Sequence, residues 1–494
     1  MGPFDLFQKK GSKALQAQPL KVRKQVVTST EPQQPLRSTF SAPNIRPVRS
    51  RKTGSSLATK AQAAKSRSPN PRKRAASGQL RLESDSEEGN TDDEKTVASV
   101  KRVRLSTEPV PDLNRHIRST DAFVEGNDFQ RSRVHAADIA AMDKPTKFKP
   151  AFLEHPDAKL VSLQYPSASD MERYCLVDPI QSDEFNTLDE IREVILITIN
   201  LYVPDHEAAL MKDDTHGLLR RLKRAMARRH ADEYNEVIQE WNGEISRLRH
   251  DEALSRKIDS WKIIDLALIE RILTQTYSRT VSPRVSLLKQ YENGTDNVYG
   301  ELLPKFVSDI LCKDTRIRSD QLFVDLGSGV GNVVLQAALQ IGCESWGCEM
   351  MDNACDLAEL QKEEFNARCH LWGLTAGSIN LERGDFLENA VVGRVLKRAD
   401  VVLVNNQAFT PDLNEALTNL FLDLKEGCLI VSLKSFVPAG HKITARNLNR
   451  ACNVLEVEEK KYYSNCVSWT DAPGTYFISK KASSRVADFA LTNA

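Results

Sequence analysis

The sequence predicts an α/β fold with a mostly parallel sheet, preceded by a mainly helical region and a basic N-terminal arm. Three observations carry this prediction. Apolar runs alternate with amphipathic stretches from Gln321 onward, a glycine-rich turn follows one of these runs, and the first 150 residues are rich in Ser, Pro, Lys and Arg. Such alternation is typical of a parallel sheet covered by helices on both faces. We therefore expect an arm over 1–150, a helical part over 151–290 and a sheet domain over 291–494.

The charge is distributed unevenly along the chain, although the formal net charge is only +1. Residues 1–82 hold about eighteen Lys and Arg against two acids, so the rest of the chain carries about −15. Few aromatic residues and no sustained apolar period predict that the arm is disordered. A basic arm on an acidic body indicates a nucleic-acid or chromatin partner. The clusters at 71–74 and 101–104 are typical of nuclear-import signals or DNA contacts, with a solvated charge run as the alternative.

The helical part is expected to begin near Phe152 with two short strands, 160–165 and 174–177. Thr187 and Glu190 have the spacing of a capping box, which predicts a helix from Thr187 toward Pro204. Further helices are predicted over 217–248 and 258–279. The first of these two begins with a dense basic cluster: Arg220, Arg221, Lys223, Arg224, Arg228 and Arg229. A solvated face is the more frequent explanation for such a cluster, and docking to an acidic histone or DNA surface is the less frequent one.

Four apolar runs predict the strands of the sheet domain: 322–324, 345–348, 401–404 and 428–431. Amphipathic stretches between them predict the helices 333–341, 353–372 and 413–424. Two last segments, 464–469 and 475–479, are expected to add an antiparallel hairpin.

Several classes of protein are disfavoured. The chain begins MGPFDLFQKK, without an apolar signal segment, and contains no run of 18 apolar residues, so we expect neither secretion nor a membrane span. No cysteine precedes Cys175, and the nine cysteines show no CxxC pair or Cys/His zinc spacing. We interpret the close group Cys343, Cys348 and Cys355 as reduced, packed thiols and predict no metal.

The strongest chemical signal is an apolar strand that ends in an acid and a glycine-rich turn. The residues we expect to bind a cofactor there are Phe323, Val324, Asp325, Leu326, Gly327, Ser328, Gly329, Val330, Gly331 and Asn332. A pyrophosphate site requires GxGxxG, whereas this turn has GxGxG with Asn332 in place of the last glycine. S-adenosylmethionine has no phosphate and carries a sulfonium and an ammonium, so Asp325 favours that donor over a dinucleotide.

Later strand ends add acids to the same edge. Glu349 ends the second strand, where a carboxylate can accept hydrogen bonds from both ribose hydroxyls. Glu344 precedes that strand and is interpreted as surface charge. Asp385 and Phe386 follow the third strand, where they can bind the adenine amino group and ring, although a simple turn would explain them if they stood alone.

The fourth strand ends in Asn405-Asn406-Gln407-Ala408-Phe409. Transfer to nitrogen requires a neutral amine aimed along the sulfur–methyl axis, and amide oxygens and aromatic faces can stabilise its developing positive charge. We expect Asn405 to be functional. For Asn406, a buried amide that caps a turn is an equally good interpretation.

Seven ordered motifs over about 180 residues make the sequence resemble the non-SET histone lysine methyltransferase family named for disruptor of telomeric silencing, and in particular its fungal branch. These motifs are at 291–302, 324–332, 347–350, 384–387, 404–406, 430–436 and 467–470. The resemblance implies a class I, Rossmann-like methyltransferase sheet that uses S-adenosyl-L-methionine. It also implies methylation of a lysine on the globular surface of nucleosomal histone H3, in mono-, di- and trimethyl steps.

The resemblance also assigns residues. It implies that Glu292, Tyr299, Gly300, Glu301 and Leu302 cover the donor, and that Asn405, Phe409 and Tyr476 line the lysine channel. Two positions depart from the animal branch, since Gln407 replaces an aromatic residue and Leu302 a hydroxyl residue. One donor contact and the detailed shape of the channel therefore stay open.

The family resemblance further implies a nuclear protein that acts in chromatin regulation, telomeric silencing and DNA-damage checkpoint signalling. It implies contact with nucleosomal DNA, here through residues 1–104, and stimulation by the H4 tail and by ubiquitin on H2B. No residue is a convincing general base, so we expect desolvation to lower the pKa of the substrate lysine and water to take its proton. Two rival interpretations are a nucleic-acid amino-methyltransferase, which would want consecutive prolines after Asn405, and a chromatin-binding protein without catalysis.

Overall fold

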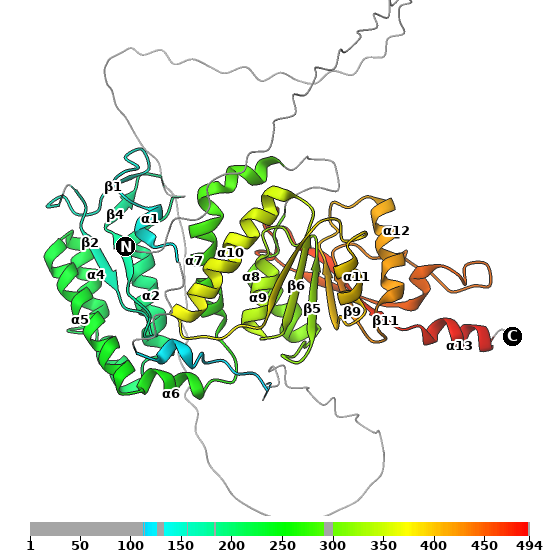
Figure 1. The fold of residues 1–494 in the computed structure, drawn as a ribbon, viewed down its shortest axis with the longest axis horizontal. Helices are drawn as coiled ribbons and strands as arrows, with labels where there is room; N and C mark the ends of the chain where they lie inside the picture. Colours follow the sequence, from blue (N-terminus) through cyan, green and yellow to red (C-terminus); the bar gives the residue numbers. More distant parts are fainter. Residues whose placement is uncertain are drawn as a thin grey trace, which may run out of the picture. The chain divides into compact units, whose positions relative to one another are not determined.

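The computed structural model describes residues 112, 114–125, 133–155, 157–181, 184–290 and 300–492. Its centre is a seven-stranded sheet in the order β10-β11-β9-β8-β5-β6-β7 (Figure 1). The strands are β5 Leu322–Leu326, β6 Glu344–Glu349, β7 Ile379–Arg383, β8 Val401–Val404, β9 Leu429–Ser432, β10 Leu455–Tyr462 and β11 Gly474–Lys481. The first five are parallel, and β11 and β10 extend the sheet antiparallel beyond β9. The predicted α/β class and mostly parallel sheet are confirmed.

Helices cover both faces of this sheet, which explains why its central strands β9, β8 and β5 are almost entirely apolar. The helices are α8 Pro304–Asp309, α9 Asn332–Gln340, α10 Asp352–Leu371, α11 Ala390–Leu396 and α12 Pro411–Leu420, with short turns η3 Ile310–Asp314, η4 Phe421–Asp423 and η5 Ala451–Val454. Phe323 of β5 packs with α8 and α9, whereas its neighbours Leu322 and Val324 pack with α11 and α12. In Figure 1, α10 and α12 accordingly lie on opposite sides of the sheet.

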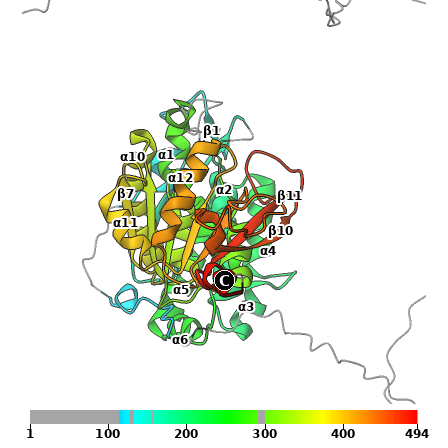
Figure 2. The ribbon, with the colours of Figure 1, turned by 90° about the vertical axis from the view of Figure 1, so that its right-hand side faces the viewer.

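The C-terminal hairpin is present, but its first strand is not where we predicted it. Strand β10 ends at Tyr462, and residues 464–469 belong to the connection to β11 (Figure 2). This connection pairs instead with the segment before α8, through a bridge between Val467 and Leu302. Strand β10 was not predicted because five of its eight residues are charged, so it has no apolar run. Charged residues are common in strands at the edge of a sheet. A last helix, α13 Ser484–Thr492, follows the hairpin.

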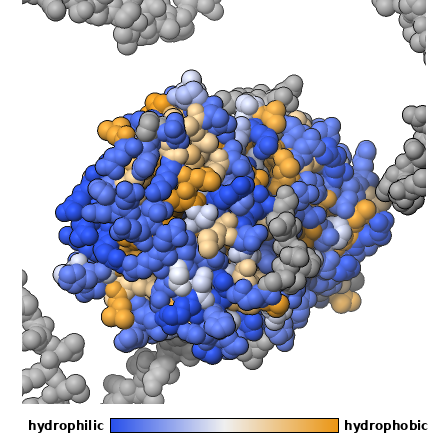
Figure 3. All heavy atoms as spheres, turned by 60° about the vertical axis from the view of Figure 1, so that its left-hand side comes forward, coloured by the Kyte–Doolittle hydropathy of each residue, from blue (hydrophilic) through white to orange (hydrophobic). Residues whose placement is uncertain are grey.

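The helical part contains more breaks than its apolar period predicts. Its helices are α2 Thr187–Leu201, α3 Asp205–Met211, α4 Leu218–Arg228, α5 Ala231–His250, α6 Ala253–Asp259 and α7 Leu266–Thr280, followed by η2 Ser282–Gln290. The expected helix 217–248 is interrupted at Arg229, which has a left-handed φ of 57°, and His230 caps α5 by accepting from the Glu233 amide. The expected helix 258–279 begins later than predicted, because α6 ends at Asp259 and α7 begins at Leu266. Helices α4 and α5 lie on the side that Figure 3 brings forward, and that face is mainly hydrophilic.

The predicted capping box at Thr187 is wrong. Asn186 is the N-cap, and its side chain accepts from the Asp189 amide at 3.1 Å. The predicted partner Glu190 is buried and turns inward, where it accepts a hydrogen bond from Gln275. The side chain expected to complete a local capping motif thus makes a long-range polar contact instead.

Ordered structure begins before the expected boundary at residue 150. Helical turn η1 Asp121–Phe123, helix α1 Ala136–Ile139 and strand β1 Phe148–Pro150 precede it, and β1 pairs with β4 Val177–Pro179. Strand β2 Leu160–Leu163 pairs with β3 Glu172–Cys175 nearby. Arg115 donates to the carbonyls of Leu339 and Thr375, which ties this early segment to the sheet domain. Residues 112–150 therefore contain parts of the core, and the boundary was placed too late because few apolar residues mark the segment.

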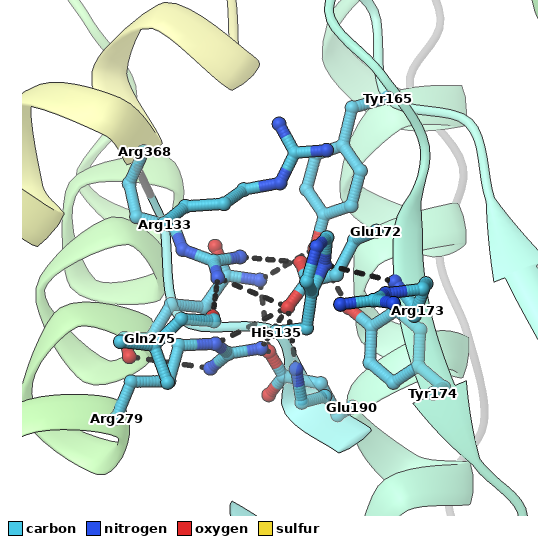
Figure 4. Close-up of polar contacts among 12 residues, drawn as sticks. Arg133, His135, Tyr165, Glu172, Arg173, Tyr174, Glu190, Gln275, Arg279 and Arg368 are labelled. Atoms are coloured by element: carbon cyan, nitrogen blue, oxygen red, sulfur yellow. Dashed lines mark hydrogen bonds and ion pairs between the residues drawn. The ribbon is translucent and has the colours of Figure 1, made fainter. Parts of the chain in front are cut away.

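A buried ion cluster joins the helical part to the sheet domain (Figure 4). Glu172 of β3 pairs with Arg279 of α7 at 2.8 Å and with Arg368 of α10, and all three side chains are fully buried. Arg368 also pairs with Glu364 at 2.6 Å. Burial disfavours the charged form of Glu172, yet the charges of Arg279 and Arg368 hold its pKa well below the ordinary value. This cluster and a continuous apolar core that runs from α2 to α10 make the two parts one body.

No described helix is long and apolar enough to cross a membrane. Within the same residues, no group of three His, Cys, Asp or Glu side chains could hold a metal ion.

Candidate active site

The predicted site lies where the strand order of the sheet reverses. Strand β5 pairs with β6 on one side and with β8 on the other, so the connections that follow β5 and β8 leave the sheet in opposite directions. Such a switch point opens a crevice beyond the carboxyl ends of the strands, and ligands of open α/β sheets bind there. The glycine-rich turn follows β5 at this edge, and Asn405 follows β8.

The backbone of the turn explains its glycines. Gly327, Gly329 and Gly331 have φ angles of 83°, 55° and 86°, a region that residues with a Cβ rarely adopt. The turn is also supported from outside, because Gln361 of α10 donates to the Val330 carbonyl at 2.6 Å and to Oδ1 of Asn332 at 3.0 Å. The predicted residues of the flanking strand, Phe323, Val324 and Leu326, are buried core residues, so only their backbone is near the turn.

Gly347 of β6 supports the same turn, and we did not single it out as a site residue. A Cβ at Gly347 would lie 2.7 Å from Oγ of Ser328 and 2.9 Å from Cγ2 of Val334. The turn therefore packs directly on the backbone of the neighbouring strand. A glycine inside an otherwise apolar strand is the signal that could have revealed this approach.

Asp325 and Glu349 bring two carboxyl groups to the crevice. Glu349 accepts from the Gly329 amide at 2.9 Å and from the Met351 amide at 2.8 Å, so its carboxylate holds the turn. Burial raises the pKa of Glu349. Burial, and then the charge of Glu349, raise the pKa of Asp325 well above its ordinary value. A cationic ligand would offset the repulsion between these two groups.

Asp385 and Phe386 follow β7, as predicted. Oδ1 of Asp385 accepts from the Leu387 amide at 2.8 Å, and the side chain is otherwise exposed. The ring of Phe386 stacks on that of Phe409, with centroids 6.5 Å apart. Phe409 also approaches the turn, because a Cβ at Gly327 would lie 3.8 Å from its Cζ. Two aromatic rings therefore stand over one end of the glycine-rich turn.

The adjacent residues Asn405 and Asn406 have different roles. Oδ1 of Asn406 accepts from the amides of Leu433 and Lys434, and its Nδ2 donates to Asn414 and to the Lys434 carbonyl. Asn406 is thus the buried structural amide of our alternative interpretation. Asn405 instead donates from Nδ2 to the Gly300 carbonyl at 2.9 Å, while its Oδ1 is buried and has no hydrogen-bond partner in the described residues.

The predicted donor-covering segment is present from Gly300 onward, whereas Glu292 and Tyr299 lie outside the described residues. Glu301 exchanges two hydrogen bonds with Ser468: its amide donates to Oγ at 2.9 Å, and its carbonyl accepts from the Ser468 amide at 2.9 Å. Gly300 lies against the Trp469 ring so closely that a Cβ there would be 2.8 Å from Cε3. Leu302 is buried in the apolar core, which leaves it without a polar contact to a ligand.

Tyr277 of α7 contacts the side chain of Glu301. Burial raises the pKa of Tyr277, and the charge and hydrogen bond of the Glu301 carboxylate raise it further. The helical part therefore supplies a residue to the donor-covering segment. The sequence offered no signal for this contact, because an aromatic residue at helical spacing is more often part of a core.

Tyr476 is placed differently from the other predicted residues. Its hydroxyl donates to Oδ2 of Asp314 at 2.7 Å, and its ring packs edge-on against Phe306 with centroids 5.0 Å apart. Burial, together with this hydrogen bond, raises the pKa of Tyr476 above its ordinary value. The structure thus brings Asn405, Phe409, the turn and Gly300 together, while the hydroxyl of Tyr476 is engaged elsewhere.

These features fit S-adenosylmethionine better than a phosphate-bearing ligand. A cation would stabilise the ionised forms of the two buried carboxyl groups, the glycine-rich turn allows close approach of a nucleoside, and the aromatic pair suits a purine ring. The unpaired Oδ1 of Asn405 is an acceptor for a second group that carries a hydrogen-bond donor.

The chain is similar to several known proteins. Residues 277–481 match the family model described as histone methylation protein DOT1. A protein of Aspergillus fumigatus named histone-lysine N-methyltransferase, H3 lysine-79 specific, is 50% identical over 99% of both chains. A protein of the same name from Emericella nidulans is 48% identical, again over 99% of both. Among solved structures, the chain is similar to an RNA methyltransferase from Salinibacter ruber, with 19% identity, a TM-score of 0.24 and coverage of 36% of this chain and 90% of that one.

The family model covers the glycine-rich turn, Glu349, Asp385 and Asn405, and the relatives match nearly the whole chain. The chain belongs to the family of DOT1 histone methylation proteins.

Proposed function

We propose that this protein transfers methyl groups from S-adenosylmethionine to lysine 79 of histone H3 in the nucleosome, in mono-, di- and trimethyl steps. The relatives that match nearly the whole chain bear this specificity in their names. The observation that supports the proposal most directly is the buried, unpaired Oδ1 of Asn405 at the switch point of the sheet. An acceptor held there suits a neutral lysine amine, which must keep its lone pair free for the methyl group.

The mechanism follows from what each side chain can do. When bound, S-adenosylmethionine supplies an electrophilic methyl group on a sulfonium sulfur. Asp325 and Glu349 balance the positive charge of the donor, and Asn405 accepts an N–H of the lysine amine and orients its lone pair. In this position Asn405 would direct the lone pair of the amine nitrogen at the methyl carbon that a bound donor would supply. Burial in the channel lowers the pKa of the incoming lysine, and water takes its proton.

The proposal extends to location and partners. The protein acts in the nucleus on nucleosomes, in chromatin regulation, telomeric silencing and DNA-damage checkpoint signalling. The basic arm binds nucleosomal DNA, since about eighteen cations in residues 1–82 suit a polyanion. The H4 tail and ubiquitin on H2B stimulate transfer. The chain thus has three parts: the arm, the helical part and the sheet domain that binds the donor.

The decisive experiment measures transfer of labelled methyl groups to intact nucleosomes, free core histones and naked DNA. Wild type is compared with Gly329→Arg and with a full-length variant in which the six cations of the clusters 71–74 and 101–104 are changed to Gln. We expect label on H3 in nucleosomes, its loss in Gly329→Arg and its reduction in the arm variant. Label on DNA would establish the nucleic-acid methyltransferase instead. Donor binding without transfer to any substrate would favour the binding protein without catalysis.

A further inference from the structure

Helix α4 carries a basic face that the proposed methyl transfer does not use. Its apolar side is buried through Leu218, Leu222 and Ala225. The opposite side consists of residues at helical spacing, all of them exposed: Arg220, Lys223, Arg224, Ala227 and Arg228. From Arg220 to Arg228 this stripe is about 12 Å long, at 1.5 Å per residue. We call these five residues the basic stripe.

The cations of the basic stripe are largely unpaired. Arg220, Lys223 and Arg224 form no ion pair or hydrogen bond with any described residue, and Arg228 has only a distant contact of 3.8 Å to Glu233. Neighbouring helix α5 shows what an ordinary solvated face looks like. There Arg247 pairs with Glu244 at 2.6 Å and with Asp251 at 3.0 Å. No acid occurs anywhere in α4.

The stability of α4 does not account for these residues. Arg220 lies in the first turn, where the helix dipole disfavours cations, and that turn contains no acid. Arg220 and Arg224, and then Arg224 and Arg228, are like charges four positions apart, which also destabilises a helix. The sequence therefore maintains a costly concentration of positive charge on one exposed face of an otherwise acidic body.

The composition of the stripe identifies the kind of partner. Protein interfaces have a core of large apolar and aromatic side chains, and the only apolar residue in the stripe is Ala227. Arginine and lysine without apolar neighbours suit a phosphate backbone, which requires charge and hydrogen-bond donors but no sequence. We propose that the basic stripe of α4 is a second DNA-docking surface, which contacts backbone phosphates of a duplex independently of the arm.

This inference rests on the proposed chromatin function, but its test is separate from methyl transfer. Binding of a short fluorescent duplex to the full chain is measured at several salt concentrations, for wild type and for Arg220→Gln/Lys223→Gln/Arg224→Gln. Three phosphate contacts contribute about 2.7 to the slope of log K against log salt. We expect the slope to fall by about that amount. The ratio of Kd at 200 mM salt to Kd at 50 mM salt should then be about forty-fold smaller for the variant than for wild type.

The matched control changes three exposed lysines elsewhere, Lys262, Lys461 and Lys480, to Gln. It removes the same charge and is expected to keep the wild-type slope. An unchanged slope in the α4 variant, or an equal fall in the control, overturns the proposal. Weaker binding to nucleosomes with unchanged binding to DNA overturns it as well and assigns the stripe to an acidic histone surface. Intact DNA docking without methylation of any nucleosome would instead contradict the proposed function.

Discussion

Asn405 and Gly300, 105 positions apart, are joined by a hydrogen bond of 2.9 Å from the Asn405 amide nitrogen to the Gly300 carbonyl. This bond fixes the amide plane and leaves Oδ1 buried and unpaired on the other side. The donor-covering segment and the residue proposed to hold the lysine are therefore positioned by the same contact. Loss of a preorganised partner of a reacting group typically costs a hundredfold or more in rate.

We accordingly expect Asn405→Ala to lower kcat on nucleosomes by about a hundredfold, with little change in donor affinity. Asn406→Ala is the informative contrast, because it leaves the buried amides of Leu433 and Lys434 unpaired and should lower the free energy of unfolding by about 3 kcal/mol. Single-turnover kinetics and urea denaturation separate the two effects. Wild-type turnover in Asn405→Ala would disprove the assignment of Asn405.

Tyr277→Phe tests the contact between the helical part and the donor-covering segment. The variant loses the hydrogen bond to Glu301 but keeps the ring. We expect the Kd for S-adenosylmethionine to rise about fivefold, which corresponds to about 1 kcal/mol. The control is Tyr234→Phe, since the hydroxyl of Tyr234 is buried without a partner and its removal should leave donor binding unchanged. Equal effects of the two substitutions, measured by calorimetry, would refute a positioning role for Tyr277.

Gly347→Ala tests the packing of the glycine-rich turn on β6. The new methyl group would overlap Ser328 and Val334, and overpacking of this kind costs about 1–3 kcal/mol. We expect a lower melting temperature and weaker donor binding, although Gly347 is not expected to touch the donor. Gly393→Ala in α11 has nothing within 4 Å of the added Cβ and should stabilise the protein by about 0.5–1 kcal/mol. Wild-type donor affinity in Gly347→Ala would contradict this account.

The raised pKa of Asp325 predicts that donor binding depends on pH. Without a ligand, burial and Glu349 favour the protonated form of Asp325, whereas a cationic donor favours the ionised form. Binding should therefore release a proton, and the Kd for S-adenosylmethionine should fall as pH rises toward the pKa of unliganded Asp325 and level off above it. Calorimetry in two buffers of different ionisation enthalpy measures this release. Asp325→Asn should bind weakly and without proton release, and release by that variant would exclude Asp325 as its source.

Local patterns predicted correctly which strand ends form the edge of the sheet that carries the candidate site. Strands β5 and β8 begin as apolar runs, and the glycine-rich turn has a characteristic spacing. The sequence alone therefore placed Asp325 and Asn405 at the ends of these two strands. Contacts between distant residues carry no such signal. Arg115 binds the Leu339 carbonyl, but the sequence around Arg115 indicates only a polar linker. Tyr277 binds Glu301, but the sequence around Tyr277 indicates only a core helix.

Charged residues at the centre of the molecule were the hardest to foresee, because Glu and Arg are almost never fully buried unless they are paired. Glu172 and Arg368 are 196 positions apart, and neither has a distinctive neighbourhood in the sequence. Arg279, which pairs with Glu172, also pairs with Glu190 at 3.2 Å and so holds that side chain in the interior, away from the expected capping box. A single long-range cluster thus changed the interpretation of a local motif.

The same cluster gives the last prediction. Arg368→Met leaves Glu172 and Glu364 buried with fewer partners, and the loss of one member of a buried pair typically costs about 3–5 kcal/mol. We expect a reduction of that size in the free energy of unfolding by urea. Arg247→Met, which removes a pair on the exposed face of α5, should cost about 1 kcal/mol or less.

The pH dependence of the cluster has a defined sign. Because the folded pKa of Glu172 is depressed, its ionised form contributes stability above the unfolded pKa of about 4.3, and this contribution is lost as pH falls further toward the folded pKa. As pH falls from about 5 to about 3, the free energy of unfolding should decrease less for the Arg368→Met variant than for wild type. Removing one cation brings the folded pKa of Glu172 closer to its unfolded value. Parallel pH curves for the two proteins would show that Arg368 does not hold Glu172 in its charged form.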